Sequence, residues 1–175
     1  MEDYVARRFM EETGKKVRRA NVLFCEESRP WMLADVDRLV VGERAGLECK
    51  TAGPFLAKHW EDGKIPVHYQ LQCAHYMQVC HAEAWYIAVL IYGREFKFYK
   101  LERDESMLAD LVKIEEDFWN NHVLKGVLPA PDGSEAADTA IAAYFQASRT
   151  ETIPLVSFDD RLKRRQELLA EMERM

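Results

Sequence analysis

The sequence predicts an α/β fold in which a mixed β-sheet is flanked by helices. Residues 84–92, AWYIAVLIY, form a nearly continuous apolar run that is rich in β-forming residues and too short for a buried helix. Residues 104–122 instead place their apolar side chains on one helical stripe. The expected order is a helix, three strands, a helix, two strands and further helices. That order is typical of a sheet covered by helices.

The first half of the chain predicts one helix and three strands. The helix runs from Glu2 to Thr13, has an apolar face and is followed by Gly14, which is placed to end it. The strands are expected at residues 16–24, 32–41 and 45–52, separated by turns at 26–30 and 42–44.

The second half predicts a helix, two strands and a helical end. Pro66 suits the first turn of a helix that reaches about Cys80. The remaining elements are expected as strands at 84–92 and 96–100, helices at 104–122, 134–145 and 158–175, and a loop at 126–133. Residues 1–125 are therefore expected to form the core domain, and residues 126–175 a C-terminal helical extension that packs on the core or projects from it.

Composition bounds the class of protein. The chain has 175 residues, 48% of them hydrophobic and 31% charged, which is typical of one ordinary globular domain. No apolar run approaches the ~20 residues that a membrane span needs, and no signal-peptide pattern is visible. The four cysteines are widely spaced and predict reduced thiols rather than a zinc or redox motif. We expect a cytoplasmic protein.

The net charge of −6 disfavours a protein whose whole surface binds nucleic acid. This charge does not exclude a nucleic-acid-binding protein, because a local basic cleft and bound cations can offset the charge of neighbouring carboxylates.

The candidate chemistry lies between Trp31 and Thr51. Side chains alternate along a strand, so Glu48 and Lys50 share one face. If their strand pairs with the preceding one as a hairpin, Asp37 and Glu48 converge. A hard divalent cation such as Mg²⁺ resolves the repulsion between two such carboxylates and can support phosphodiester hydrolysis. Lys50 can then orient the attacking water or neutralise the developing charge.

An acid-x-lysine pattern is common on solvated strands, so the spacing alone is weak. Its setting strengthens it, because Leu47 and Cys49 flank the charged residues with apolar surface.

A second signal lies in the helix that follows. Gln72 and Tyr76 are separated by four residues and therefore lie on one helix face. They fit an ordinary polar face with a packed tyrosine, or a helix over the metal site in which Gln72 bonds a phosphate or the lysine. Glu2, taken alone, is an ordinary acid at a helix start.

Together these pieces resemble a known family. The stretches LADVDRLV and LECKTA and the Gln72-x-x-x-Tyr76 element are similar to the lambda-exonuclease-like, YqaJ-type viral recombinases. These belong to the PD-(D/E)xK nuclease superfamily, close to RecB-like nuclease domains. The resemblance covers roughly Glu2 to Val123, with Val36 at the position of the superfamily's proline. Because of this departure Asp35 competes with Asp37 as the metal ligand, and the resemblance favours Asp37 because Arg38 follows it as in relatives. It implies a restriction-endonuclease-like sheet and a Mg²⁺- or Mn²⁺-dependent exonuclease that hydrolyses double-stranded DNA in phage-type recombination.

The resemblance also implies roles for individual residues. The metal ligands would be Asp37, Glu48 and the carbonyl of Cys49, with a contribution from Glu2. The catalytic residues would be Asp37, Glu48, Lys50, Gln72 and Tyr76. The DNA contacts would be Lys50, Gln72 and Arg38.

Partners follow from the same resemblance. It implies double-stranded DNA ends as substrate, a single-strand annealing protein as partner, a trimeric homo-oligomer and no membrane. Members of the family begin with a segment that grips the DNA 5′ end, and we expect this chain to be a core that lacks it.

Two other functions compete with the nuclease. One is a catalytically inactive remnant that binds DNA ends or another protein. The other is a hydrolase of small phosphate substrates, which the absence of a phosphate-cradling glycine loop in the sequence disfavours.

Overall fold

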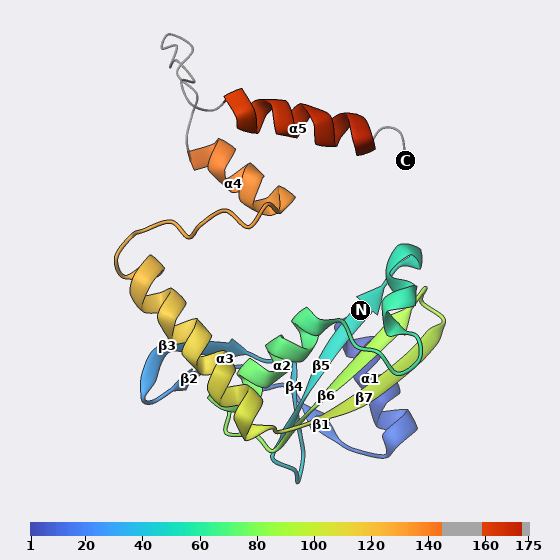
Figure 1. Ribbon diagram of the computed structural model, residues 1–175. Coiled ribbons are helices and arrows are strands. Elements are labelled where there is room, and N and C mark those ends of the chain that lie inside the picture. The colour runs from blue at the N-terminus through green and yellow to red at the C-terminus, as the bar shows by residue number, and fades with distance from the viewer. Residues whose placement is uncertain (145–158, 173–175) are drawn as a thin grey trace. The chain divides into compact units, whose positions relative to one another are not determined.

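The computed structural model describes residues 1–144 and 159–172. The chain divides into two compact units, residues 1–127 and 128–175, coloured from blue to orange and from orange to red in Figure 1. The first unit carries every strand of the described residues and the candidate site.

The first unit is built on a five-stranded sheet in the order β1-β4-β5-β6-β7. Its strands are β1 (Val17–Arg18), β4 (Arg38–Val40), β5 (Ala45–Ala52), β6 (Ala84–Ile91) and β7 (Glu95–Glu102). Strands β5 and β6 are parallel, and the other neighbours are antiparallel. The predicted mixed sheet is therefore confirmed.

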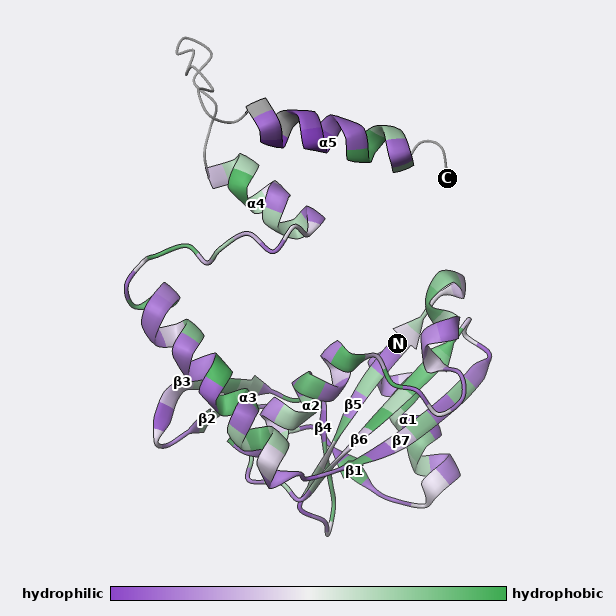
Figure 2. Cartoon of the chain, viewed as in Figure 1, coloured by the Kyte–Doolittle hydropathy of each residue, from purple (hydrophilic) through white to green (hydrophobic). Residues whose placement is uncertain are grey.

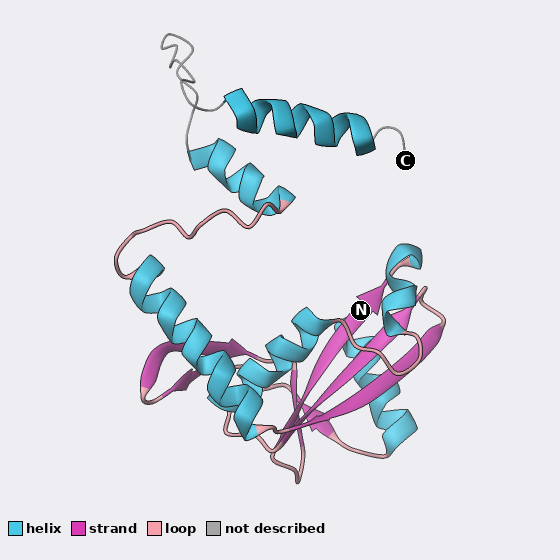
Figure 3. Ribbon diagram, in the orientation of Figure 1, coloured by secondary structure: helices cyan, strands magenta, loops and turns pink. Residues whose placement is uncertain are grey.

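Helices cover both faces of this sheet (Figure 3). Helix α1 (Glu2–Thr13) contacts β5 and β6 on one face, and Gly14 ends it in the left-handed conformation with φ 69°. Helix α2 (Val67–Val79) contacts β6 on the other face and also packs on helix α3 (Glu105–Phe118). Because parallel strands need a crossover connection, α2 is the link that carries the chain from β5 to β6.

Two apolar cores form on the two sides of the sheet. Val5 and Phe9 of α1 pack against Leu47 and Tyr86 on the first side. A larger cluster fills the second side, and its largest buried members include Trp60, Met77, Trp85, Ile87 and Leu108. Strand β6 is buried along its whole length, as its apolar run predicts, and is coloured mostly as hydrophobic in Figure 2.

The predicted strand at residues 16–24 is wrong in one respect. The structure divides it into β1 and a second strand, β2 (Leu23–Glu26), which belong to different sheets. Asn21 lies between them with φ 54°, a conformation that asparagine tolerates better than most residues.

The predicted strand at residues 32–41 is also divided. Strand β3 (Arg29–Asp35) pairs with β2 in a separate two-stranded sheet, whereas β4 joins the main sheet. The break falls at Val36 and Asp37, where the Asp37 side chain bonds the backbone of β5. The turn expected at 26–30 is shorter, because the pairing of β2 and β3 continues to Glu26 and Arg29.

Three further differences concern ends and short turns. The predicted helix at 104–122 starts with the Asp104 side chain as its cap, ends as an α-helix at Phe118 and continues as a π-helical turn, η2 (Trp119–Val123). A 3₁₀ segment, η1 (Pro54–Trp60), follows β5 and was not predicted. Strand β7 is longer at both ends than the expected 96–100.

The described part of the second unit contains two helices, α4 (Glu135–Tyr144) and α5 (Asp159–Met172). They confirm the predicted helices at 134–145 and 158–175 over the residues described; positions 145, 158 and 173–175 of those predictions lie outside them. Among the described residues, no helix combines the length and the apolar character that a membrane crossing requires.

Candidate functional site

The site is built where strand β4 stops pairing with β5. The paired residues are Arg38 with Leu47 and Leu39 with Gly46, so the antiparallel pairing assumed for this hairpin is confirmed. Asp37 comes directly before β4, and its Oδ2 accepts a hydrogen bond of 2.7 Å from the Cys49 N–H. The Asp37 carboxylate thus accepts the hydrogen bond that a backbone carbonyl of a longer β4 would have accepted from Cys49. This bond places the Asp37 side chain beside the middle of β5.

Glu48 and Lys50 share the face of β5 that α2 covers, as their spacing predicts. Lys50 Nζ lies 2.5 Å from Glu48 Oε1, and the two side chains are 18% and 6% exposed. A charge buried to this degree needs a partner or a counter-ion. Lys50 supplies one partner for the Glu48 carboxylate.

Burial sets the electrostatics of the two carboxylates. Burial raises the pKa of Glu48, and the negative charge of Asp37 raises it further, against the opposing effect of the Lys50 ion pair. Burial also raises the pKa of Asp37, opposed chiefly by the hydrogen bond from the Cys49 backbone. Both groups therefore hold their protons more tightly than exposed carboxylates do, which is the condition that a nearby cation relieves.

Helix α2 adds a chain of polar contacts to this centre. Lys50 Nζ donates to Gln72 Oε1 at 3.0 Å, and Gln72 Nε2 donates to the Tyr76 hydroxyl at 2.8 Å. The structure thus brings Lys50 of β5 into contact with Gln72, and Gln72 into contact with Tyr76 on the same face of α2.

The sequence did not single out Tyr69, which also belongs to the centre. Lys50 Nζ lies 4.4 Å from the centroid of the Tyr69 ring, within the range of a cation–π contact. Tyr69 precedes Gln72 by three residues, so the same helical spacing that joined Gln72 to Tyr76 could have identified it.

Arg38 and Glu2 form a second layer next to the centre. Arg38 is buried, with an exposed fraction of 5%. Its guanidinium forms an ion pair with Glu2, contacts Asp3 Oδ1 at 2.6 Å and donates to the Asp37 carbonyl at 2.5 Å. Arg38 thereby ties the start of α1 to the backbone of Asp37, and this burial does not favour the predicted contact of Arg38 with DNA. The sequence did not reveal the role of Asp3.

Asp35 lies outside this arrangement. It is exposed at the end of β3 and faces Leu23 across the small sheet. Of the two aspartates that the sequence offered, Asp37 is the one beside Glu48 and Lys50.

A polar link beside the site connects three elements. His75 of α2 places Nδ1 2.9 Å from Glu115 Oε1 of α3 and Nε2 3.0 Å from the Leu33 carbonyl of β3. The Glu115 carboxylate raises the pKa of His75 despite its burial. This link holds α2 against its neighbours, and its two partners could not be inferred from sequence spacing.

The donor set at the centre is two carboxylates and backbone oxygen. No cluster of three carboxylate, imidazole or thiol groups ready for a metal ion occurs in residues 1–144 and 159–172. Mg²⁺ is nevertheless usually held by one or two carboxylates, with waters and substrate oxygens in the other positions. Asp37 and Glu48 fit that chemistry, because both are oxygen donors and the charges of the half-buried Asp37 and the buried Glu48 favour a cation.

Comparison with known proteins agrees with this architecture. Residues 1–83 match the family described as the YqaJ-like viral recombinase domain. The chain is 41% identical over 160 residues to protein YqaJ of Bacillus subtilis (strain 168), an alignment that covers 90% of this chain and 50% of that protein. The chain therefore spans half the length of this relative.

Solved structures show the same fold. The alkaline exonuclease LHK-Exo of Laribacter hongkongensis is similar with a TM-score of 0.63 at 18% identity, over 71% of this chain and 66% of that one. A phage-related exonuclease of Haemophilus somnus 129PT is similar with a TM-score of 0.51 at 13% identity, over 64% and 62%. Residues 1–83 are therefore similar to the YqaJ-like viral recombinase domain, and the chain shares its fold with the alkaline exonuclease.

Proposed function

We propose that this chain is a metal-dependent DNA nuclease that hydrolyses phosphodiester bonds, and that it acts as an exonuclease on double-stranded DNA ends. The observation that carries the proposal is the pair of carboxylates, the buried Glu48 and the half-buried Asp37, beside Lys50 on β5. The names of the relatives, a viral recombinase domain and an alkaline exonuclease, support DNA as the polymer. A further LHK-Exo structure contains dAMP, a nucleotide of DNA.

Asp37 and Glu48 would hold a Mg²⁺ or Mn²⁺ ion, together with the carbonyl of Cys49. The N–H and C=O of one strand residue point to the same edge, so the bond from Cys49 N–H to Asp37 indicates that the Cys49 carbonyl also faces the Asp37 side. When bound, the ion supplies Lewis-acid stabilisation of phosphate charge and lowers the pKa of a water. Glu2 stays a predicted contributor, although its carboxylate pairs with Arg38 here.

Lys50 is the residue that would act on the reacting groups. Its ammonium lies between Glu48 and Gln72, and its position is fixed by both and by the Tyr69 ring. It can donate a hydrogen bond to the attacking water or to a phosphate oxygen where negative charge develops. Gln72 and Tyr76 would orient the Lys50 ammonium through their own hydrogen bond.

The test is digestion of linear double-stranded DNA by the purified chain with Mg²⁺. We expect Lys50→Ala to lower the rate by about 10²–10³-fold, the usual effect of removing one group that stabilises developing charge. Asp37→Ala should abolish metal-dependent cleavage and weaken Mn²⁺ binding measured by calorimetry. Asp35→Ala is the matched control, because Asp35 is an exposed acid only two residues away, and it should digest DNA at the wild-type rate.

Digestion that survives both Asp37→Ala and Lys50→Ala would contradict the assignment of the centre. Loss of activity in Asp35→Ala alone would move the aspartate role to the neighbouring residue.

A non-catalytic DNA-end-binding or protein-interaction module is the second candidate. The ion pair between Lys50 and Glu48 favours it, because the carboxylate is already neutralised within the chain. Metal-independent DNA binding, with no cleavage in Mg²⁺ or Mn²⁺, would support this module over the nuclease. A single-strand annealing partner and a trimer remain predictions from the resemblance.

A further inference from the structure

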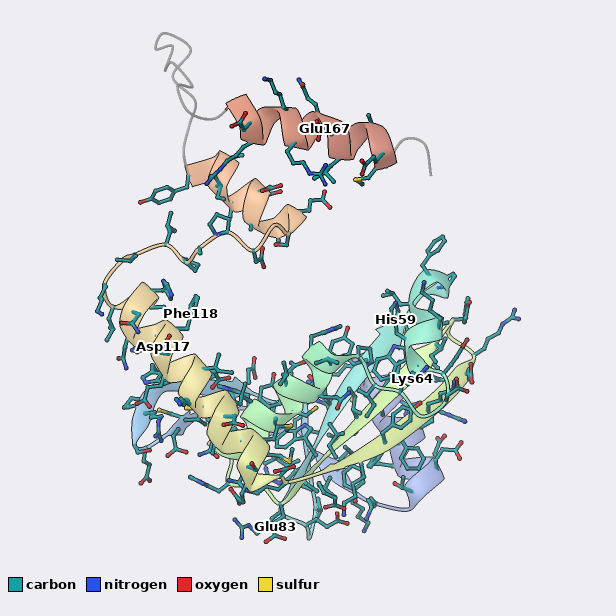
Figure 4. All side chains as sticks on the ribbon, viewed as in Figure 1. His59, Lys64, Glu83, Asp117, Phe118 and Glu167 are labelled. Carbon is teal, nitrogen blue, oxygen red and sulfur yellow. The ribbon has the colours of Figure 1, made fainter. Side chains whose placement is uncertain are left out.

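A surface hollow opens beside the candidate site at the end of β5. It has a volume of about 260 Å³, just under the ~300–1,000 Å³ of pockets that enclose a drug-sized ligand. Its lining comes from η1 and the first turn of α2 and includes Leu56, His59, Trp60, Val67, His68 and Tyr69. Figure 4 labels His59 on the η1 turn at the end of the sheet.

The hollow adjoins the proposed phosphodiester centre. Thr51 and Ala52, the two residues after Lys50, line it together with Tyr69. The Tyr69 ring also lies 4.4 Å from Lys50 Nζ, so one aromatic side chain borders both places. A molecule with a phosphate at Lys50 would extend its attached group toward this hollow.

The walls offer one exposed aromatic ring, that of His68, and exposed apolar surface. The Trp60 ring is buried and stacks with both Tyr69 and Tyr99, so it supports the wall from behind. The Tyr69 ring is stacked on the buried Trp60 ring with centroids 5.7 Å apart, and the His68 and Tyr69 ring centroids are 4.0 Å apart. Leu56 and Val67 are 53% and 68% exposed, although each is apolar. An exposed ring such as His68, held against packed aromatic neighbours and flanked by exposed apolar side chains, is a surface on which a nucleobase can stack.

We propose that this hollow is a nucleobase subsite that receives the base next to the phosphate held at Lys50. The inference rests on the proposed nuclease function for the identity of the polymer and adds the place where a base is bound. Stacking on an aromatic face is tolerant of sequence, because every base has a π-face. We therefore expect the subsite to recognise the presence of a base rather than its identity.

The experiment measures binding without hydrolysis. The full chain, in EDTA, is titrated with fluorescein-labelled single-stranded pentanucleotides in which each position in turn is abasic. We expect removal of the base at one position to weaken binding by about tenfold, as the loss of one base–aromatic contact does. Replacing adenine by thymine at that position should change the affinity by less than about threefold, because stacking is sequence-tolerant.

Two variants assign the effect to the hollow. His68→Ala and Val67→Asp should remove the penalty for the abasic position, so that normal and abasic strands bind alike. His68→Tyr keeps an aromatic ring and should preserve the penalty. Val41→Ala is the matched control, because Val41 is 53% exposed but follows β4, near the opposite end of β5. That control should leave the penalty unchanged.

The proposal is overturned if no abasic position weakens wild-type binding by more than about twofold, or if both hollow variants keep the full penalty. DNA binding that Val67→Asp leaves unchanged at every position would mean that the hollow serves another occupant, such as a peptide, and would also overturn it. The outcome is separable from the proposed activity. A chain that never cleaves DNA but shows the abasic penalty contradicts the nuclease alone, whereas a chain that cleaves without the penalty contradicts the subsite alone.

Discussion

Gly46 of β5 is the position at which one added methyl group would disturb the structure most directly. It faces Trp85 across the parallel β5–β6 pair, and the indole lies against its backbone. A Cβ at residue 46 would stand 2.1 Å from Trp85 Cζ2 and 2.3 Å from Cη2. Real carbon atoms do not approach so closely, so Gly46→Ala forces the ring or the strand to move.

The ring has little room to move. Trp85 is fully buried, and the Tyr76 ring packs against it with centroids 5.4 Å apart. Overpacking of a core usually costs about 1–3 kcal/mol, and a clash with an enclosed ring belongs at the upper end of that range. We therefore expect Gly46→Ala to lower the free energy of unfolding by about 3 kcal/mol and the melting temperature by roughly 10 °C.

The assay is urea and thermal unfolding followed by circular dichroism, with Gly53→Ala as the control. Gly53 has φ −81° and no atom within 4 Å of an added Cβ, so this variant should unfold within about 1 kcal/mol of wild type. Trp85→Leu should cost less in the Gly46→Ala background than alone, because the smaller side chain relieves the clash. A Gly46→Ala chain as stable as the Gly53→Ala control would refute the reasoning.

Three other predictions follow from single contacts. Glu115 raises the pKa of His75, so the ion pair stabilises the fold fully below pH about 6.5, and this stability is lost as the pH rises through the folded pKa. His75→Gln should therefore make the melting temperature less dependent on pH between pH 6 and 9. An unchanged pH profile would contradict the link. Asp104→Ala removes the cap that accepts from the third residue of α3 at 3.0 Å and should cost about 1 kcal/mol in urea unfolding, whereas Asp104→Asn should restore most of it. Cys25 is exposed, whereas burial raises the pKa of Cys73 to about 12, so DTNB should label Cys25 rapidly and Cys73 only in urea; equal native rates would contradict the burial.

The centre of the site could be predicted from sequence because it depends on short periodicities. Alternation along a strand placed Glu48 with Lys50, and helical spacing placed Gln72 with Tyr76. The structure joins the two pairs through the hydrogen bond from Lys50 to Gln72. Predicting each pair required only the local spacing of its two residues, and no information on residues far away in the chain.

The parts that could not be predicted depend on distant contacts. The strand expected at 32–41 divides because the Asp37 side chain bonds Cys49 of β5, an interaction twelve residues away. The close approach of Trp85 to Gly46 requires the parallel register of β5 and β6, which no local pattern reports. The buried setting of Arg38 likewise depends on carboxylates at the start of α1.

The bond between the Cys49 N–H and the Asp37 carboxylate gives this chain a built-in spectroscopic reporter. An amide proton bonded to a carboxylate has a resonance that responds to the charge and geometry of that carboxylate. A single labelled nitrogen at Cys49 would therefore follow, by NMR, the ionisation of Asp37 and its recruitment by a cation, without any added probe and without waiting for a chemical step. The rate at which the same amide proton exchanges with deuterated solvent would report how often its hydrogen bond to the Asp37 carboxylate opens.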